Sequence, residues 1–180
     1  MRLFIGFPLS KDAAADTAHI AGHCALHIPG RYSLPENYHM TLAFLGEVPP
    51  EDLGKAKDAL NAFAAQFSAP QLTLGALSYF RQAQNAVLIR QVSSPDDLAA
   101  MHSALISELD MRALAHTDGP FSPHVTLARH ADVSGADLQT YAFSPVSFAA
   151  HHAVLYLSAR DDQNVLRYTP LASAPFVNSI

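Results

Sequence analysis

The sequence is short of cysteine, of charge and of long apolar runs, and each shortage excludes a class of protein. Its single cysteine, Cys24, rules out an internal disulfide and suits a reducing compartment. Charged residues make up only 15% of the 180 residues and the formal net charge is −5, which argues against a protein that coats nucleic acid generally. We therefore expect any nucleic acid to be held at an end or over a few nucleotides.

The apolar stretch nearest the start, LFIGFPL (3–9), is too short for the core of a signal peptide or for a membrane span. We expect a soluble, cytoplasmic, monomeric protein with no membrane partner.

Several cofactor and nucleotide motifs are missing as well. The sequence has no Walker loop, no GxGxxG and no GxSxG, so ATP-dependent ligation and serine hydrolysis lack support. Three of its ten histidines, His19, His23 and His27, are spaced for one face of a helix. No cysteine or carboxylate at suitable spacing completes a closed site around them, so we interpret them as a solvated face that continues Asp12 and Asp16. We expect no metal and no other cofactor.

The apolar pattern predicts an α+β domain over residues 1–180. Short links and alternating strands favour antiparallel pairing over a doubly wound parallel sheet. The expected helices cover 10–28, capped by Ser10, then 49–67, and 93–114, with Ser94 as cap and Pro95 in the first turn. The expected strands cover 3–9, 39–46, 71–80, 86–92, 124–129, 147–159 and 166–176.

An internal repeat links two of these strands. Residues 35–53 align with 120–138 at a constant offset of 85 and without gaps, with eight identities in nineteen positions. The identical pairs include His39 with His124 and Thr41 with Thr126, inside the matching stretches HMTLA and HVTLA. The repeat predicts two similar halves that each bring one strand to a shared cleft.

Strand geometry then indicates the chemistry of that cleft. Side chains two apart point the same way, so His39 lies beside Thr41 and His124 beside Thr126. Two imidazoles that titrate near neutrality can serve as one acid and one base, while hydroxyls donate hydrogen bonds to an oxyanion. This set suits the in-line opening of a phosphodiester, in particular a ribose 2′,3′-cyclic phosphate, and needs no metal.

The two motifs match the paired His-x-Thr-x motifs of the 2H phosphoesterase superfamily. Four longer stretches, RLFIGFPLS, PENYHMTLAFLGEV, FSPHVTLAR and LYLSARDDQNVLRYTPLASAPF, resemble its RNA 2′,3′-cyclic phosphodiesterase branch, also called 2′-5′ RNA ligase-like. The resemblance implies a bilobal fold of two pseudo-symmetric halves, with antiparallel sheets lining a central cleft and helices outside. It also implies hydrolysis of RNA 2′,3′-cyclic phosphate ends, or of nucleoside 2′,3′-cyclic phosphates, to 2′-phosphates.

The resemblance further implies roles for single residues. His39 would be the proton donor and His124 the proton acceptor, with Thr41 and Thr126 holding phosphate oxygens. Arg129 follows the second motif where the family often has a basic residue, which implies a phosphate contact. Simple alternation places Arg129 on the face opposite His124, so this contact requires a twist or a bulge in the strand. Phe7 and Phe121 are candidate stacking surfaces for a base, although burial in the core is the commoner place for phenylalanine.

Three alternatives stay open at this level. An ATP-independent, reversible 2′-5′ ligation would use a 5′-hydroxyl in place of water. A related enzyme could act on a small cyclic phosphate or on a 2′-5′ oligonucleotide. A non-catalytic module that binds RNA ends or nucleotides would keep the cleft, although phosphate binding alone does not need two groups poised to exchange protons.

Overall fold

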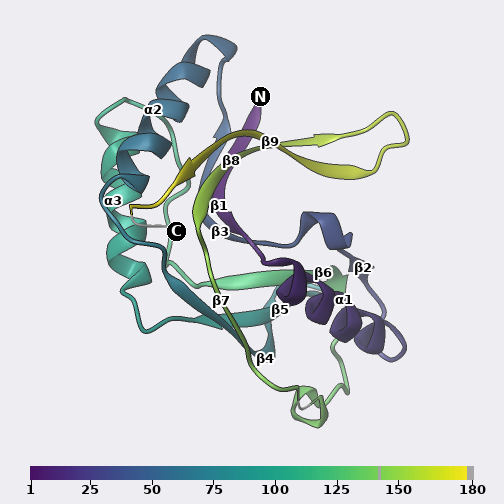
Figure 1. Ribbon diagram of the computed structural model, residues 1–180. Coiled ribbons are helices and arrows are strands. Elements are labelled where there is room, and N and C mark those ends of the chain that lie inside the picture. Colours follow the sequence, from purple (N-terminus) through teal and green to yellow (C-terminus); the bar gives the residue numbers. More distant parts are fainter. Residues whose placement is uncertain (142, 178–180) are drawn as a thin grey trace.

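One curled antiparallel sheet organises the computed structural model, which describes residues 1–141 and 143–177 (Figure 1). Within these ranges the strands are β1 (Arg2–Pro8), β2 (Arg31–Tyr32), β3 (His39–Glu47), β4 (Gln71–Arg81), β5 (Ala86–Ser93), β6 (His124–Ala131), β7 (Val146–Ala149), β8 (His152–Arg160) and β9 (Leu166–Pro175). The helices are α1 (Lys11–Ala25), α2 (Leu53–Ala64) and α3 (Leu98–Asp110), with short 3-10 turns η1 (Pro35–Asn37), η2 (Pro50–Asp52) and η3 (Leu138–Thr140). The predicted α+β class with antiparallel pairing is confirmed.

The two motif strands occupy the middle of the sheet. The strand order runs β7-β4-β5-β6-β3-β1-β8-β9, with β2 added beside β6. The two motif strands, β3 and β6, are therefore neighbours, and they pair antiparallel at Met40 and Val125. The predicted halves are thus parts of one continuous sheet: β3, β1, β8 and β9 on one side of this pair, and β6, β5, β4 and β7 on the other.

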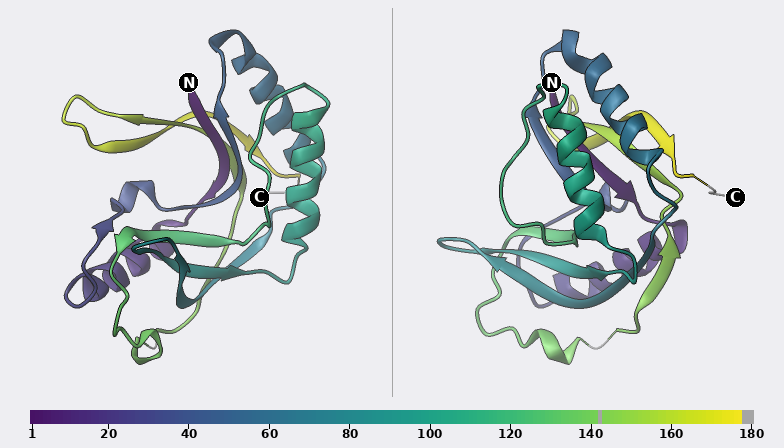
Figure 2. Two further views of the ribbon diagram at one scale, coloured as in Figure 1. Left: turned by 180° about the vertical axis from the view of Figure 1, so that it is seen from behind. Right: turned by 90° about the vertical axis from the view of Figure 1, so that its left-hand side faces the viewer.

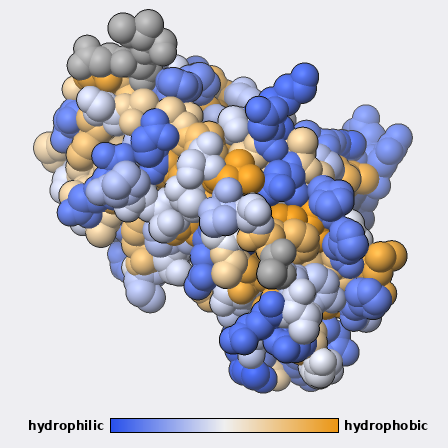
Figure 3. All heavy atoms as spheres, turned by 60° about the horizontal axis from the view of Figure 1, so that its bottom comes forward, coloured by the Kyte–Doolittle hydropathy of each residue, from blue (hydrophilic) through white to orange (hydrophobic). Residues whose placement is uncertain are grey.

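The helices cover the two halves separately. α2 and α3 lie side by side, with α2 against β8 and β9 and α3 against β3, whereas α1 packs against β6 and β7 of the other half (Figures 1 and 2). In the described chain, no helix is long and apolar enough to span a membrane. The face shown in Figure 3 mixes hydrophilic residues with smaller hydrophobic areas.

A buried arginine holds α1 in place. Arg90 on β5 has no exposed surface, and its guanidinium donates to the carbonyl oxygens of Gly75 at 3.1 Å and Ser144 at 3.3 Å. It also forms an ion pair with the partly exposed Asp16 on α1. A buried charge is tolerated only when it is paired and hydrogen-bonded. Asp16, predicted as part of a solvated stripe, is thus only partly exposed and pairs with the buried Arg90.

The histidines of α1 are exposed, as a solvated face requires. The rings of His19 and His23 meet edge to face with centroids 5.3 Å apart, and His27 lies beyond the last residue of the helix. Within residues 1–141 and 143–177, no three histidine, cysteine, aspartate or glutamate side chains form a group that could hold a metal ion.

The helix starts follow their caps. The Ser10 hydroxyl accepts a hydrogen bond from the Ala13 amide, as predicted. The prediction that α3 begins near Ser94 and Pro95 is wrong, because Asp97 caps the Ala100 amide at 2.9 Å and the helix begins at Leu98. The Ser94 hydroxyl instead accepts from the Asp96 amide in the preceding loop.

The prediction of one strand over 147–159 is also wrong. The segment forms two strands that belong to different halves, since β7 pairs with β4 and β8 pairs with β1. The chain passes from one half to the other at Ala150 and His151, and the Ala150 amide donates to the Pro70 carbonyl at 2.9 Å. Neither glycine nor proline marks this crossing in the sequence, so the apolar pattern continues across it.

The contact between β1 and β3 leaves room only for glycine at position 6. A Cβ atom on Gly6 would lie 2.6 Å from the Met40 carbonyl oxygen, which is backbone and cannot turn away. Met40 is also the residue that pairs with β6, so β1 supports the strand at the centre of the sheet.

We expect Gly6→Ala to lower the free energy of unfolding by roughly 1–3 kcal/mol, because the added methyl overpacks two backbones. Gly22→Ala is the matched control: it lies inside α1 with no atom within 4 Å of a new Cβ. That change should raise the free energy of unfolding by up to about 1 kcal/mol. Urea unfolding of both variants tests this, and equal midpoints would contradict it.

Candidate active site

Four residues singled out by the repeat meet in one cleft. β3 begins at His39 and β6 begins at His124, so the two motifs occupy matching positions in adjacent strands. The cleft encloses about 160 Å³. It is lined by Ser33, Asn37, His39, Thr41, Phe44, Phe80, Val87, His124, Thr126, Arg129 and Tyr168. These residues come from strands, η1 and a loop, which leaves α1, α2 and α3 outside.

The same bulge occurs in both motif strands. In β3, Leu42 is the extra residue between the pairs Gly6–Thr41 and Ile5–Ala43. In β6, Leu127 is the extra residue between the pairs Ile89–Thr126 and Leu88–Ala128. Leu42 and Leu127 are equivalent in the repeat, so the two strands share a departure from regular alternation.

The bulges decide which side chains reach the cleft. After two consecutive buried residues, the next residue in each strand is exposed: Phe44 in β3 and Arg129 in β6. Both line the cleft beside the histidines. The condition set for Arg129, a bulge that turns it to the His124 side, is therefore met. Its contact with phosphate stays a prediction.

Each histidine is oriented by a backbone carbonyl two residues before it. His39 Nδ1 lies 2.7 Å from the Asn37 carbonyl oxygen, and His124 Nδ1 lies 2.7 Å from the Ser122 carbonyl oxygen. A carbonyl oxygen can only accept, so Nδ1 carries the hydrogen in both rings and Nε2 is the atom free to exchange a proton. His39 Nε2 also lies 2.9 Å from Thr41 Oγ1, whose hydroxyl donates to it when the ring is neutral.

The surroundings of the two rings differ. His39 packs among aromatic side chains, with centroid distances of 4.7 Å to Phe4 and 5.0 Å to Tyr168. Burial lowers the pKa of His39 to about 4; the Asn37 carbonyl opposes this, while His124 and Arg129 add to it. Burial and Arg129 also lower the pKa of His124, against the Ser122 carbonyl. Both shifts favour the neutral imidazole in the free cleft, and an anion beside His39 would favour its protonation.

The two predicted stacking residues lie in different places. Phe7 has no exposed surface and packs edge to face against Phe176 in the core, so its prediction as a base-stacking surface is wrong. Phe121 is half-buried, stacks on His102 at 4.5 Å and lines a neighbouring apolar cavity of about 350 Å³. That cavity shares Thr41, Phe80 and His124 with the cleft of the two histidines, so stacking on Phe121 stays a prediction.

The sequence analysis did not predict six of the eleven residues that line the cleft, and three of these six, Asn37, Phe80 and Tyr168, contact the histidines. The Phe80 ring meets His124 edge to face with centroids 4.8 Å apart, which parallels Tyr168 against His39. Asn37 stands two residues before His39, as Ser122 stands before His124, so the repeat marks the position although the side chains differ.

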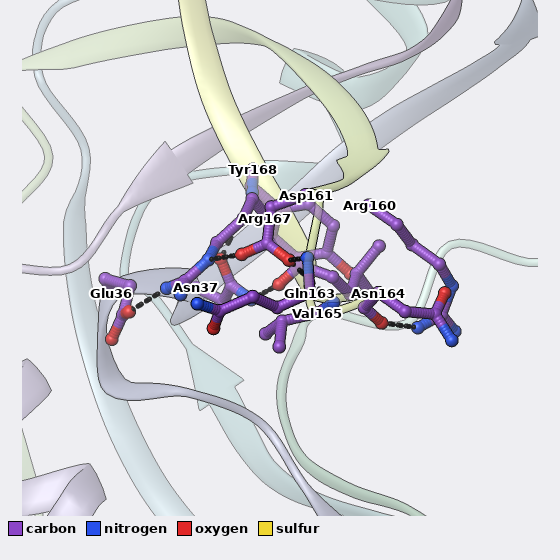
Figure 4. Close-up of polar contacts among 10 residues, drawn as sticks. Glu36, Asn37, Arg160, Asp161, Gln163, Asn164, Val165, Arg167 and Tyr168 are labelled. Atoms are coloured by element: carbon purple, nitrogen blue, oxygen red, sulfur yellow. Dashed lines mark hydrogen bonds and ion pairs between the residues drawn. The ribbon is translucent and has the colours of Figure 1, made fainter.

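Asn37 ties the site to a projecting hairpin, which we call the β8–β9 arm and define as residues 158–168. The side-chain nitrogen of Asn37, Nδ2, donates to the Leu166 carbonyl at 2.8 Å, and its side-chain oxygen accepts from the backbone amide of Tyr168 at 3.2 Å. Figure 4 shows Arg167 reaching both Asp161 in the arm and Glu36 beside Asn37. The arm and His39 are thus held by one short segment, η1.

Known proteins resemble this chain in sequence and in fold. A family model described as the 2′-5′ RNA ligase superfamily matches residues 7–162. An RNA 2′,3′-cyclic phosphodiesterase of Escherichia coli (strain K12) is 31% identical over 94% of this chain and 93% of its own length. One of Geobacillus stearothermophilus is 26% identical over 98% of this chain, which spans only 57% of that relative. The crystal structure of E. coli LigT complexed with 3′-AMP superposes with a TM-score of 0.71, at 29% identity and covering 98% of each chain.

We expect His39 in the free protein to titrate with a pKa of about 4, and inorganic phosphate to raise that pKa by roughly 1 or more, because a nearby anion favours the imidazolium. NMR titration of the ring signals with and without phosphate measures both. The ring signals of His19, on the exposed face of α1, serve as the control and should not respond to phosphate. A His39 pKa near 6.5 in the free protein would contradict the burial argument.

We expect Asn37→Ala to lower the free energy of unfolding by roughly 1–3 kcal/mol, because Asn37 is only 7% exposed and its loss leaves the Leu166 carbonyl and the Tyr168 amide without their partner. The control is Asn61→Ala, an exposed asparagine on α2, which should stay within about 0.5 kcal/mol. An Asn37 variant as stable as the Asn61 variant would show that the hydrogen bonds from Asn37 to the β8–β9 arm do not stabilise the fold.

Proposed function

The chain belongs to the 2′-5′ RNA ligase superfamily, and on that premise we propose that its cleft hydrolyses RNA 2′,3′-cyclic phosphate ends to 2′-phosphates, with His39 as acid and His124 as base. The family match and the relatives named RNA 2′,3′-cyclic phosphodiesterase support cyclic phosphodiesterase activity. The assignment of single residues rests on the geometry of the cleft.

The observation that carries the proposal is the matched anchoring of the two imidazoles. Each Nδ1 is bound at 2.7 Å to a carbonyl at the same place in the repeat, so both Nε2 atoms are the groups left to exchange protons. One cleft also holds the hydroxyls of Thr41 and Thr126 and the guanidinium of Arg129. Two proton-exchanging nitrogens around several donors suit a reaction whose transition state is anionic and needs a base and an acid at once.

The reaction balances as follows. Water attacks the phosphorus while His124 Nε2 accepts its proton, and the bond between phosphorus and the ribose O3′ breaks. His39 Nε2–H donates its proton to the departing O3′, which leaves a 2′-phosphate and a 3′-hydroxyl. Thr41, Thr126 and Arg129 donate to the non-bridging oxygens, whose charge is greatest in the transition state. Solvent then returns His39 and His124 to their starting protonation states.

The low pKa of His39 assigns a role to the substrate itself. An imidazole with a pKa of about 4 carries little charge at pH 7, so the free cleft is not yet an acid and base pair. A cyclic phosphate brings a negative charge into the cleft, which raises the pKa of His39 and lets it bind a proton together with the substrate. In this proposal the ring becomes an acid only when there is a phosphate to act upon.

Ligation uses the same atoms. If the 5′-hydroxyl of a second RNA replaces water, His124 accepts its proton, the bond to O3′ breaks and a 2′-5′ linkage forms. No ATP is consumed, since the energy of the cyclic ester drives the step. The reverse reaction returns the cyclic phosphate through the same two histidines.

We expect the purified protein, with EDTA present, to convert a nucleoside 2′,3′-cyclic phosphate to the 2′-phosphate, resolved from the 3′-isomer by chromatography. His39→Ala and His124→Ala should each lower kcat/KM by roughly 10²–10⁴, the usual contribution of a general acid or base. The wild-type rate should be bell-shaped in pH, because one imidazole must be charged and the other neutral. His19→Ala, on the exposed face of α1, is the control and should keep full activity.

Other results would point elsewhere. A 3′-phosphate product, or full activity in either cleft variant, would refute the assigned roles. Tight nucleotide binding without turnover, with affinity rising steadily as the pH falls, would identify a binding module. Turnover of a small cyclic phosphate or a 2′-5′ oligonucleotide, but not of RNA ends, would identify a different substrate for the same chemistry.

A further inference from the structure

Another cavity, larger than the two already described, adjoins the catalytic cleft. It encloses about 530 Å³ and lies between the β8–β9 arm and the outer ends of β1 and β3. Its walls include Arg2, Phe44, Arg129, Ser158, Arg160 and Tyr168. Phe44, Arg129 and Tyr168 also line the catalytic cleft, so the two spaces share three wall residues.

Three arginines from three different strands line this cavity: Arg2 on β1, Arg129 on β6 and Arg160 on β8. This is a local concentration of positive charge in a protein whose formal net charge is −5. Such a concentration costs free energy through mutual repulsion unless an anion offsets it.

The three arginines are not used in ion pairs within the described chain. Glu47 stands opposite Arg2 in the strand register, but its carboxylate pairs with the amino terminus at 3.3 Å. Arg160 donates to the Asn164 carbonyl at 2.6 Å, which uses one of its five N–H groups. Asp161, in the same arm, is bound by Arg167 instead.

Size and chemistry both point to part of a nucleotide chain. The catalytic cleft of about 160 Å³ is small for a whole nucleotide, whereas 530 Å³ falls in the range of roughly 300–1,000 Å³ typical of ligand sites. Arginines bind phosphate oxygens through charge-assisted hydrogen bonds, and these contacts position a chain without reading its sequence.

We propose that this cavity binds the phosphate on the 5′ side of the terminal nucleotide, through Arg2 and Arg160, so that the enzyme prefers RNA ends to mononucleosides. The proposal rests on the proposed function, because the terminal cyclic phosphate must lie between His39 and His124. Arg129, shared by both spaces, lies between the two phosphates.

Three substrates separate this contact from the chemistry: a nucleoside 2′,3′-cyclic phosphate, the same compound with a 5′-phosphate, and a dinucleotide ending in the cyclic phosphate. For the wild type, kcat/KM should be roughly tenfold or more higher for the second and third than for the first, the size expected of hydrogen bonds to a charged group. Arg2→Gln and Arg160→Gln should each remove most of that gain and leave kcat/KM for the first substrate unchanged. Raising the salt concentration should narrow the difference in the wild type.

Lys57→Gln is the matched control, since it removes one positive charge on α2, away from both spaces, and should keep the preference. Arg2 and Arg160 are exposed, so unfolding midpoints equal to that of the wild type should exclude a folding defect. Equal kcat/KM for all three substrates in the wild type would overturn the subsite. An equal loss on all three substrates in the arginine variants would overturn it as well, because the arginines would then act in the chemistry.

A binding experiment tests the subsite independently of the proposed hydrolysis. If the wild type hydrolyses none of the three substrates, equilibrium binding of a nucleoside 2′-phosphate and of the 2′,5′-bisphosphate decides the subsite. Tighter binding of the bisphosphate, lost in Arg2→Gln and Arg160→Gln, would uphold it without catalysis. The same affinity for both compounds would overturn it.

Discussion

The pairing of β3 with β6 is the constraint on which the site depends. These neighbours run antiparallel and meet at Met40 and Val125, so residues at equal places in the repeat are related by an approximate twofold axis between the strands. His39 and His124 each precede a residue of that pair, and their rings face the same cleft. Both strands are anchored by their own side chains in the hydrophobic core, among them Met40, Leu42, Val125 and Leu127. A slip of one residue between these strands would turn one histidine away from the other.

Part of this arrangement could be predicted from the sequence, because side-chain alternation and an internal repeat can both be recognised from the spacing of residues. The two His-x-Thr pairs, the antiparallel class and the Ser10 cap are of this kind. A bulge is not, since the extra residue, Leu42 or Leu127, has the same apolar character as its neighbours. The crossing at Ala150 was hidden for the same reason.

Other features depend on backbone atoms or on tertiary contacts, which cannot be predicted from the residue types. The histidines are oriented by the backbone carbonyls of Asn37 and Ser122, which any residue could supply. Phe7 is buried against Phe176, and the buried Arg90 is paired with Asp16. Both partners are distant in sequence, so the residue types alone do not reveal these contacts. Chemical identity could therefore be predicted along each strand, whereas the order of the strands and the partners across the fold could not.

The two halves of the sheet differ in how far apart in the sequence their strands lie. The half built from β4, β5, β6 and β7 draws its strands from residues 71–149, a continuous stretch, although α1 covers it from the amino-terminal side. The half that holds His39 needs β8 and β9, which begin at His152, to pair with β1, which begins at Arg2. During synthesis on the ribosome, β1 and β3 must wait for almost the whole chain before their sheet is complete, with the entropy cost of closing so long a loop. The half with the more buried histidine is therefore the last to be assembled, and the two imidazoles face each other only once the carboxyl-terminal hairpin has docked.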